Sequence, residues 1–385
     1  MSAVAARGMQ AGRPVDSAVA DFWLLLAVAA LLSLGTVMVY SATIAADSRT
    51  LALNSGHLIK HLIHLGVGLV LMLGAWRLNL DWLQSMSRPL LFGGIVLLVV
   101  VLLVGREVNG SVRWIDLGVF QLQPSELMKI FMLVYMADYL ARKQADLGEF
   151  RVGVVNVALV VGGVGLLLLL EPDFGTTAVI VATVGGMLFL AGLRLTHLLL
   201  IVLVAGALLA LLVWIEPYRM ARLMSYRDPW ADPYGNGFQL VQALIAIGRG
   251  EWFGSGLGSS IQKLFYLPHA GNDFLAAVIG EELGATGIFT VIALYGLLLW
   301  RAFVIGRRAL LEGQAFAGFL AHGIGLLLAL QAAIHIGVNT GILPTKGLTL
   351  PLMSYGGSSM VSAMLAVGLL LAVDRHSRPH PGGRL

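Results

Sequence analysis

Residues 153–193 read GVVNVALVVGGVGLLLLLEPDFGTTAVIVATVGGMLFLAGL, and this stretch decides the fold. It consists of two apolar runs, 153–170 and 174–193, which are separated only by the three residues Glu171–Asp173. A helix that crosses a bilayer needs about 20 mostly apolar residues, and each run is close to that length. The stretch therefore predicts two membrane-spanning helices joined by a tight turn.

The rest of the chain has the same character. Of its 385 residues, 58% are hydrophobic and only 12% are charged, whereas soluble domains carry about 25% charged residues. This composition excludes a disordered chain, a nucleic-acid-binding module and an ordinary soluble enzyme. The chain has no cysteine, which also excludes disulfides and thiolate metal sites. We expect an all-α, polytopic membrane protein with about ten transmembrane helices, at 22–44, 58–76, 89–105, 124–141, 153–170, 174–193, 196–215, 274–300, 315–338 and 352–373.

Cationic residues predict the topology, because Lys and Arg are enriched in cytoplasmic loops. They gather in one set of alternate loops, for example at Arg77, Arg142 and Arg301. Both termini are therefore expected to be cytoplasmic, with an uncleaved first helix. The apolar pattern of 237–250 predicts a helix in the long loop between the seventh and eighth apolar runs. The predicted organisation is a cytoplasmic tail at 1–21, a transmembrane domain at 22–373 with one large extracytoplasmic loop at 216–273, and a cytoplasmic tail at 374–385.

Asp273 lies where this outer loop meets an apolar run. It could cap the helix, because an Asp at a helix N-terminus satisfies free N–H groups and suits the helix dipole. It could instead be a general base at the membrane surface, kept ionised by the dipole and therefore not strongly basic. Glu281 and Glu282 lie about two turns further into the helix and should face the protein interior. They either bind neighbouring elements or line a substrate or ion pathway.

Charged residues also surround the start of the fourth predicted helix. Arg113 precedes it, and Glu126 and Lys129 lie three residues apart on one of its faces. These two side chains could neutralise each other, or Lys129 could join Arg113 in an anion site that faces the outer leaflet. Asp173 either caps the helix that follows it or anchors polar backbone inside the bundle.

The run GILPTKGLTLPLMSYGGSS at 341–359 is rich in proline and glycine, which argues against a regular helix. Non-helical backbone at membrane depth must be covered by protein or line a wet cavity. The run is therefore either a structural re-entrant turn or a site in which Lys346 binds a phosphate. His57, His61 and His64 share one helical face and could hold a metal, but no carboxylate accompanies them, so an interfacial polar face is favoured.

Taken together, these segments resemble the SEDS family (shape, elongation, division and sporulation) of integral membrane proteins. The resemblance spans nearly the whole chain, from the first predicted helix to the tenth. Residues 344–351 are more similar to the cell-division branch of the family than to its elongation branch. The motifs that carry the resemblance are Asn109–Gly118, Gln123–Lys129, Pro172–Thr177, Gln239–Gly258, Gln262–Pro268, Asp273 with Gly280–Gly284, and Pro344–Ser359.

The resemblance implies a peptidoglycan glycosyltransferase that polymerises lipid II, a disaccharide-pentapeptide on undecaprenyl diphosphate. The reaction would take place at the outer face of the bacterial cytoplasmic (inner) membrane during septal cell-wall synthesis. Asp273 matches the essential loop Asp of the family and would be the catalytic base. Cations should stabilise the diphosphate leaving group, and a divalent cation (Mg or Mn) could share that role, although the sequence shows no dedicated metal cage. The expected substrate-binding residues are Arg113, Lys129, Lys346, Glu126, Asp173, Lys263, Ser354 and Ser358.

One segment departs from the family pattern. Before the Asp the family commonly has Glu-Ala-His-Thr, whereas this chain has His269-Ala270-Gly271-Asn272. Either this loop is held differently or activity depends more heavily on a partner. The implied partners are a class B penicillin-binding protein, which is a crosslinking transpeptidase, and other divisome proteins. The alternative functions are a lipid II flippase, an elongation-type polymerase of the same family, and a non-catalytic scaffold.

Overall fold

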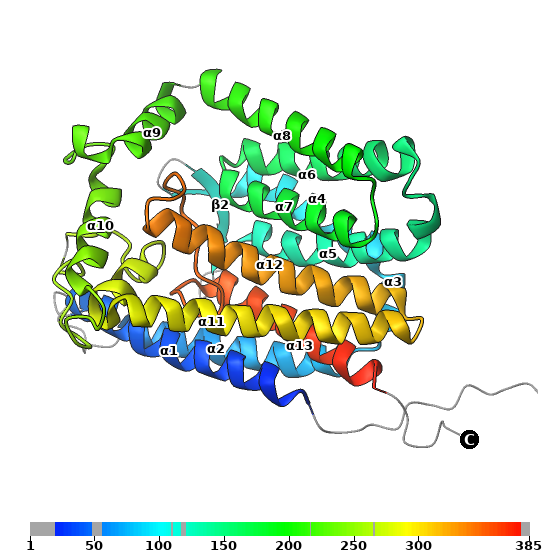
Figure 1. Cartoon of the computed structure of the whole chain (residues 1–385), viewed down its shortest axis with the longest axis horizontal. Coiled ribbons are helices and arrows are strands. Elements are labelled where there is room, and N and C mark those ends of the chain that lie inside the picture. The colour runs from blue at the N-terminus through cyan, green and yellow to red at the C-terminus, as the bar shows by residue number, and fades with distance from the viewer. Residues whose placement is uncertain are drawn as a thin grey trace, which may run out of the picture.

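The computed structural model describes residues 20–47, 56–108, 111–116, 121–215, 217–264 and 266–378. These residues form a bundle of helices whose long axes run roughly along one direction (Figure 1). The helices are α1 (Phe22–Asp47), α2 (Gly56–Trp76), α3 (Leu80–Ser85), α4 (Ser87–Val104), α5 (Pro124–Lys143), α6 (Asn156–Leu170), α7 (Phe174–Leu190), α8 (Leu195–Ile215), α9 (Pro217–Arg227), α10 (Phe238–Gly250), α11 (Leu275–Leu311), α12 (Ala315–Asn339) and α13 (Gly357–His376).

Each of the ten apolar segments predicted from the sequence contains a helix. Among the described residues, seven helical segments are long and apolar enough to cross a membrane. Two shorter apolar helices, α7 and the 195–208 part of α8, correspond to two further segments, and α5 corresponds to the tenth. The prediction of an all-α, multi-pass membrane protein is confirmed. The domain boundaries stay a prediction, and residues 1–19 and 379–385 of the predicted tails lie outside the described residues.

The chain enters and leaves the bundle at the same end (Figure 1). There Arg301 of α11 binds the carboxylate of Asp21, which directly precedes α1. Arg308, two turns further along α11, lies 3.0 Å from Asp374 near the end of α13. These ion pairs fasten the first and last helices to α11.

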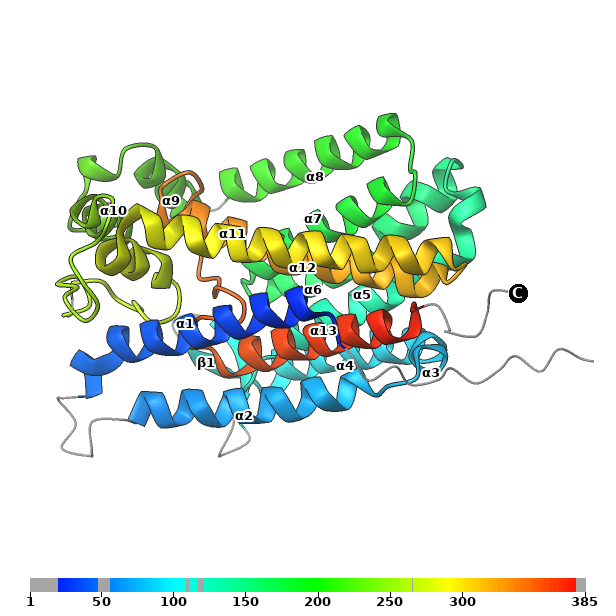
Figure 2. The same ribbon diagram turned by 60° about the horizontal axis from the view of Figure 1, so that its bottom comes forward.

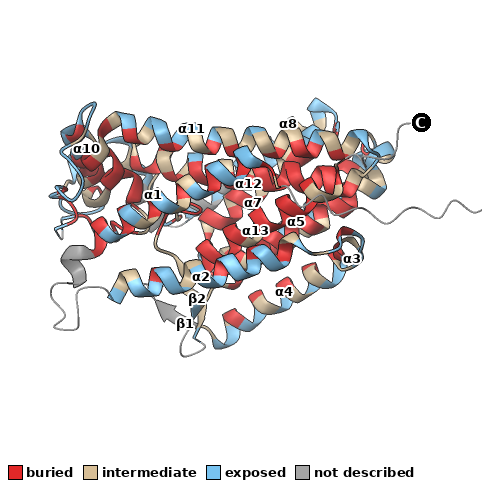
Figure 3. Cartoon of the chain, turned by 90° about the horizontal axis from the view of Figure 1, so that it is seen from below, coloured by how far each residue is buried: buried red, intermediate tan, exposed pale blue. Residues whose placement is uncertain are grey.

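The core of the bundle is formed by α12 and α13, which are buried along most of their length (Figure 3). Close approach of α2 to α13 depends on Gly368, because a Cβ atom there would lie 2.4 Å from the carbonyl oxygen of Met72. Small residues allow such contacts between membrane helices. The outer faces of α2, α4 and α8 instead expose apolar side chains such as Val70, Leu103 and Leu203, as expected of surfaces that face lipid.

The structure also has a small sheet between α4 and α5, which was not predicted. Its strands are β1 (Arg106–Val108), β2 (Ser111–Asp116) and β3 (Gln121–Leu122), in the order β1–β2–β3 with antiparallel pairing. The strands are short, so their alternation of side chains was too weak a pattern to predict them. Residues 109–110 and 117–120 of this predicted motif region lie outside the described residues.

The outer loop contains α9, the turn η3 (Pro229–Ala231) and α10, which confirms the helix predicted at 237–250. The residues that follow α10 form hydrogen bonds with α11 at a break in that helix. Gly284 has a φ of 70° and interrupts that helix. The N–H group of Ala285 therefore donates to the carbonyl oxygen of Glu251 at 2.9 Å, and that of Thr286 donates to Trp252 at 3.1 Å. The outer loop and α11 thus share backbone hydrogen bonds.

The run between α12 and α13 is non-helical up to Gly356, as its prolines and glycines predicted (Figure 2). Side chains of α12 satisfy its carbonyl groups. Gln331 donates to Thr349 at 3.1 Å, and His335 donates to Leu348 at 2.6 Å. This is the protein cover that non-helical backbone needs at membrane depth.

Candidate active site

Asp273 lies two residues before α11 begins. Its N–H group donates to the carbonyl oxygen of His269 at 3.1 Å, and His269 itself has a φ of 56°. The residue at the N-cap position of α11 is Phe274, and it makes no side-chain capping bond. The Asp273 carboxylate forms no hydrogen bond with any described residue. Asp273 therefore does not cap α11, which was one of its two possible roles.

The Asp273 carboxylate lies against the backbone of Gly347. A Cβ atom on Gly347 would lie 3.0 Å from Oδ2 and 3.9 Å from Oδ1. Gly347 is exposed and Asp273 is partly buried, so the carboxylate adjoins accessible surface. Burial raises the pKa of Asp273, while the charges of His269 and Arg113 act in the opposite direction. The sequence suggested a carboxylate of low basicity, but removal from water makes it a better proton acceptor than expected.

Lys346, the residue before Gly347, faces the start of α7. Its ammonium nitrogen lies 4.8 Å from the centroid of the Phe174 ring, and a cation at that distance is attracted by the electron-rich ring face. A neighbouring contact fixes the same segment, because a Cβ atom on Gly175 would lie 2.9 Å from the side chain of Leu348. Lys346 is thus held beside the turn between α6 and α7.

Arg113 of β2 reaches the same turn. Its Nε donates to the carbonyl oxygen of Glu171 at 3.0 Å, and its Nη2 donates to the carbonyl oxygen of Pro172. Asp173 caps α7, because Oδ1 accepts from the N–H group of Thr176 at 3.1 Å. The Asp173 carboxylate also accepts from the hydroxyl of Ser125 on α5 at 3.1 Å. The capping role considered for Asp173 is confirmed, and a substrate-binding role for it stays a prediction.

Glu171 is the buried acid of this turn. Its side chain is fully buried, and neither carboxyl oxygen has a hydrogen-bond partner in the described part of the chain. Burial, together with the negative charge of Asp173, raises the pKa of Glu171 to about 8 against the opposing effect of Arg113. Glu171 is therefore mostly protonated at neutral pH. A neutral Glu171 adds no negative charge beside Arg113.

The structure thus brings three predicted site residues to one end of the bundle. Asp273 adjoins the residue that follows Lys346, Lys346 faces the first residue of α7, and Arg113 binds the turn that precedes α7. The positive charge of Arg113 acts on the Asp273 carboxylate. A partly buried carboxylate and two cations therefore lie around the starts of α7 and α11.

The other two predicted cations lie in buried ion pairs. Lys129 Nζ is 2.9 Å from Glu126 Oε2, and it also donates to the side-chain oxygen of Gln331 at 2.8 Å. Lys263 Nζ is 2.7 Å from Glu282 Oε1. Mutual neutralisation of Glu126 and Lys129 is confirmed. Substrate-binding roles for Glu126, Lys129 and Lys263 stay predictions.

Glu281 and Glu282 bind neighbouring elements, which was one of the two roles considered for them. The Glu282 carboxylate accepts from the hydroxyl of Ser41 on α1 at 2.6 Å and from the N–H group of Gly258 at 3.0 Å. Glu281 accepts from the N–H group of Ile261 at 2.9 Å. Both carboxylates are fully buried, and together they hold the outer loop onto α11.

Ser354 and Ser358 join backbone segments around the site. The Ser354 hydroxyl donates to the carbonyl oxygen of Asn272 at 2.8 Å. The Ser358 hydroxyl donates to the carbonyl oxygen of Gln121 at 2.9 Å and accepts from the N–H group of Gln123 at 3.0 Å. These bonds position the loops, and a direct role of either serine in substrate binding stays a prediction.

Two residues that touch Asp273 were not predicted as site residues. One is Gly347, and the other is Asn339, whose Nδ2 donates to the carbonyl oxygen of Asp273 at 3.0 Å. Asn339 directly follows the ninth apolar run, 315–338, and Thr340 alone separates it from the run at 341–359. An amide in such apolar surroundings was a usable signal, because polar groups inside membrane helices are costly and usually have a specific partner.

The histidines of α2 pack against an aromatic ring. The ring centroids of His57 and His61 lie 5.5 and 6.3 Å from that of Tyr355, which agrees with the favoured interpretation as a polar face. Over the described ranges, no group of three or more His, Asp or Glu side chains is arranged to hold a metal ion. The use of a divalent cation stays a prediction.

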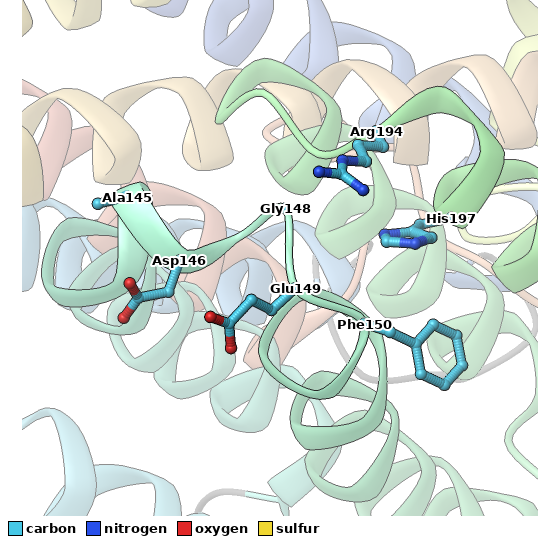
Figure 4. A pocket seen from close by; sticks show the side chains of 7 residues that line it. All are labelled: Ala145, Asp146, Gly148, Glu149, Phe150, Arg194 and His197. Atoms are coloured by element: carbon cyan, nitrogen blue, oxygen red, sulfur yellow. The ribbon is translucent and has the colours of Figure 1, made fainter.

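A polar hollow of about 550 Å³ lies elsewhere (Figure 4). It lies between the α5–α6 and α7–α8 connections. Because α7 begins beside Lys346 and is roughly 25 Å long, the hollow at its other end is separate from the site around Asp273. Its lining residues are Ala145, Asp146, Gly148, Glu149, Phe150, Arg194 and His197.

Comparison with solved structures finds the same architecture. A chain from a structure described as structural coordination of polymerization and crosslinking by a peptidoglycan synthase complex matches with a TM-score of 0.78 and 31% identity, covering 93% of this chain and 98% of that one. The crystal structure of the rod shape determining protein RodA from Thermus thermophilus matches with a TM-score of 0.69 and 31% identity, covering 94% and 98%.

Comparison with curated proteins finds relatives of similar length. Proteins named probable peptidoglycan glycosyltransferase FtsW are 52% identical in Nitrosococcus halophilus, covering 93% of both chains, and 47% identical in Legionella pneumophila, covering 96% of this chain and 95% of that one. The family model FTSW_RODA_SPOVE, described as a cell cycle protein, matches residues 22–379. These matches confirm the family that the sequence motifs suggested, and the chain belongs to the FtsW, RodA and SpoVE family of cell cycle proteins, the SEDS family.

Proposed function

We propose that this chain is a peptidoglycan glycosyltransferase that polymerises lipid II into glycan strands. The names of its curated relatives support the activity. The observation that carries the proposal is the contact of the Asp273 carboxylate, which has no hydrogen bond to a described residue, with Gly347, next to Lys346. The carboxylate suits a proton acceptor, and the cations suit a diphosphate leaving group.

The reaction follows from these roles. The C4 hydroxyl of the acceptor GlcNAc attacks C1 of the MurNAc at the end of the growing strand, and its proton passes to the Asp273 carboxylate. The bond between C1 and the diphosphate oxygen breaks, and its electron pair leaves with undecaprenyl diphosphate. A raised pKa of Asp273 favours the proton transfer, because the carboxylate is a stronger base than one in water.

Arg113 and Lys346 are the proposed partners of the departing diphosphate. Fixed positive charges aimed at a group on which negative charge develops stabilise the transition state. The neutral Glu171 beside Arg113 keeps that charge available. A divalent cation bound to the diphosphate could share this role. The described residues offer it no cage of their own, so no step is assigned to it.

We also propose that the polymerase works with a class B penicillin-binding protein, which crosslinks the new strands, and with other divisome proteins. The related synthase complex, which coordinates polymerization and crosslinking, supports such a pairing. The division role is supported by relatives named FtsW at 45 to 52% identity, compared with 31% for RodA. The protein would lie in the inner membrane at the septum, with both termini cytoplasmic.

Purified full-length protein, paired with its transpeptidase where the wild type requires it, should convert fluorescent lipid II into long strands. Asp273→Asn should remove this activity and keep a wild-type melting temperature, because it replaces one oxygen without changing the shape of the side chain. Strand synthesis by Asp273→Asn at more than a tenth of the wild-type rate would refute the base assignment. Transfer of lipid II across proteoliposome membranes without strand formation would instead support a flippase.

A further inference from the structure

Asn339 is the last residue of α12, and its side chain is fully buried. Its amide joins two helices at the base of the site. Nδ2 donates to the carbonyl oxygen of Asp273 at 3.0 Å and to that of His335, in its own helix, at 2.8 Å. Oδ1 accepts from the N–H group of Ala277 at 3.0 Å. The bonds to His335 and Ala277 are buried, and the bond to Asp273 is partly buried.

The bond from Ala277 to Asn339 acts as a helix cap. Helices leave their first N–H groups unsatisfied, and a polar side chain at the N-cap normally accepts from the third residue of the helix. In α11 the N-cap residue is Phe274, whose side chain has no such atom, and the third residue is Ala277. The N–H group of Ala277 is shared between the carbonyl oxygen of Phe274 and Asn339 Oδ1, each at 3.0 Å. Asn339 supplies the missing oxygen from another helix.

This arrangement has a consequence for the neighbouring carboxylate. Asp273 is one residue from the N-cap and, as an Asp, could itself be drawn into the cap, where its charge would be neutralised by N–H groups. Its carboxylate instead lies at Gly347. Because Asn339 already occupies the cap and holds the Asp273 carbonyl, the carboxylate is left without a hydrogen bond to any described residue.

We propose that Asn339 is a positioning residue for the proposed base: it caps α11 from α12 and tethers the Asp273 backbone, so that the carboxylate stays directed at Gly347. This inference rests on the proposed function. Other bonds hold earlier residues of the loop, since Ser354 binds Asn272 and the N–H group of Tyr355 donates to the carbonyl oxygen of Gly271 at 2.9 Å. The Asn339 amide is the side chain that binds Asp273 itself among the described residues.

Two substitutions separate the cap from the tether. Asn339→Ala removes both. Asn339→Asp keeps an oxygen that can accept from Ala277 and loses both donated bonds. We expect kcat for strand synthesis to fall at least tenfold in both variants, since a displacement of about 1 Å at a reacting group can cost roughly 10²-fold. KM for lipid II should change less than threefold. Asn339→Asp should melt closer to the wild type than Asn339→Ala does.

A pH profile distinguishes positioning from simple loss of folded protein. Burial raises the pKa of Asp273, and His269 on its own loop and Arg113 on β2 oppose this effect. In Asn339→Ala, which adds no charge, water reaches the carboxylate, so the pKa of Asp273 falls and the acid limb of kcat should move to lower pH. If the variant only contained less folded protein, kcat would fall at every pH and the acid limb of the pH profile would stay in place.

Thr340→Ala is the matched control. Thr340 follows Asn339, and its hydroxyl bonds only to Ile336 and Gly337 of its own helix, so this variant should keep wild-type kcat and pH profile. Wild-type kcat in Asn339→Asp, or an unmoved acid limb in folded Asn339→Ala, would overturn the inference. If Asn339→Ala does not fold, Asn339→Asp carries the test alone, through kcat.

An active Asp273→Asn would refute the proposed base, whereas an inactive Asp273→Asn with active Asn339 variants would refute only the positioning role.

Discussion

A Cβ atom on Gly347 would lie 3.0 Å from Oδ2 of Asp273, so the backbone of the run between α12 and α13 forms one wall around the proposed base. The wall and the base come from segments that are far apart in the sequence. Their contact makes the position of the carboxylate sensitive to a single methyl group.

Gly347→Ala should therefore lower the rate of strand synthesis by about 10- to 100-fold, because the carboxylate must move away from the added methyl group. Protein yield and melting temperature should stay close to wild type, since Gly347 is exposed. Gly296→Ala on α11 is the control, because its Cβ atom would meet nothing within 4 Å. Unchanged turnover in Gly347→Ala would show that the carboxylate is not confined at this position.

Lys346→Met should lower kcat/KM by about 100- to 1,000-fold, the range seen when one preorganised transition-state contact is removed. Lys346→Arg should recover part of the loss, because the charge returns with a different shape. Lys143→Met provides a comparison, since Lys143 lies at the other end of α5 in an exposed pair with Asp146. Initial rates over a range of lipid II concentrations measure the effect. Equal losses in Lys346→Met and Lys143→Met would contradict a specific role for Lys346.

The Lys263–Glu282 pair should contribute mainly to folding. Removing one partner of a buried ion pair costs about 3–5 kcal/mol, so Lys263→Met should lower the melting temperature by several degrees. The double variant Lys263→Met with Glu282→Gln should recover part of that loss, because no unpaired buried charge remains. Thermal unfolding in detergent measures both. A raised KM with an unchanged melting temperature in Lys263→Met would instead support direct substrate binding by Lys263.

Glu171 should make stability depend on pH. Its pKa is about 8 in the folded chain and near the ordinary value of 4.5 when unfolded, so the folded state holds a proton that the unfolded state loses. The resulting stabilisation is complete below about pH 4.5 and is lost as pH rises to about 8. Glu171→Gln cannot ionise, so its melting temperature should exceed that of the wild type increasingly from pH 6 to pH 8.

Glu149→Gln is the control for that experiment, because Glu149 is exposed and should leave the pH dependence of the melting temperature as it is in the wild type. Parallel melting curves for wild type and Glu171→Gln across this pH range would show that Glu171 is already ionised at neutral pH.

Much of the fold could be predicted because it depends on local properties. The ten apolar runs, the break at 341–356 and the helix at 237–250 each follow from residues that are close together in the sequence. The strands of the small sheet were missed because they are short. The run that contains Asp273 and the one that contains Lys346 were also identified, but their contact was not.

The candidate site depends on pairings that no local pattern contains. The sequence allowed Asp273 to be either a cap or a base, and the structure decided against the cap because Asn339, 62 positions from Ala277, supplies the capping oxygen. It allowed Glu282 to bind a neighbour or line a pathway, and Ser41, 241 positions away, is the neighbour it binds.

The sequence by itself determined that the chain spans a membrane many times, where most of its helices lie, and which family its motifs resemble. Those features follow from hydrophobicity, which acts residue by residue along the chain. The folded arrangement was needed to show which charges are neutralised in the interior and which carboxylate has no hydrogen bond to a described residue. A buried polar group takes whichever partner the packing of distant helices brings within about 3 Å, and the order of residues in the chain does not specify that partner.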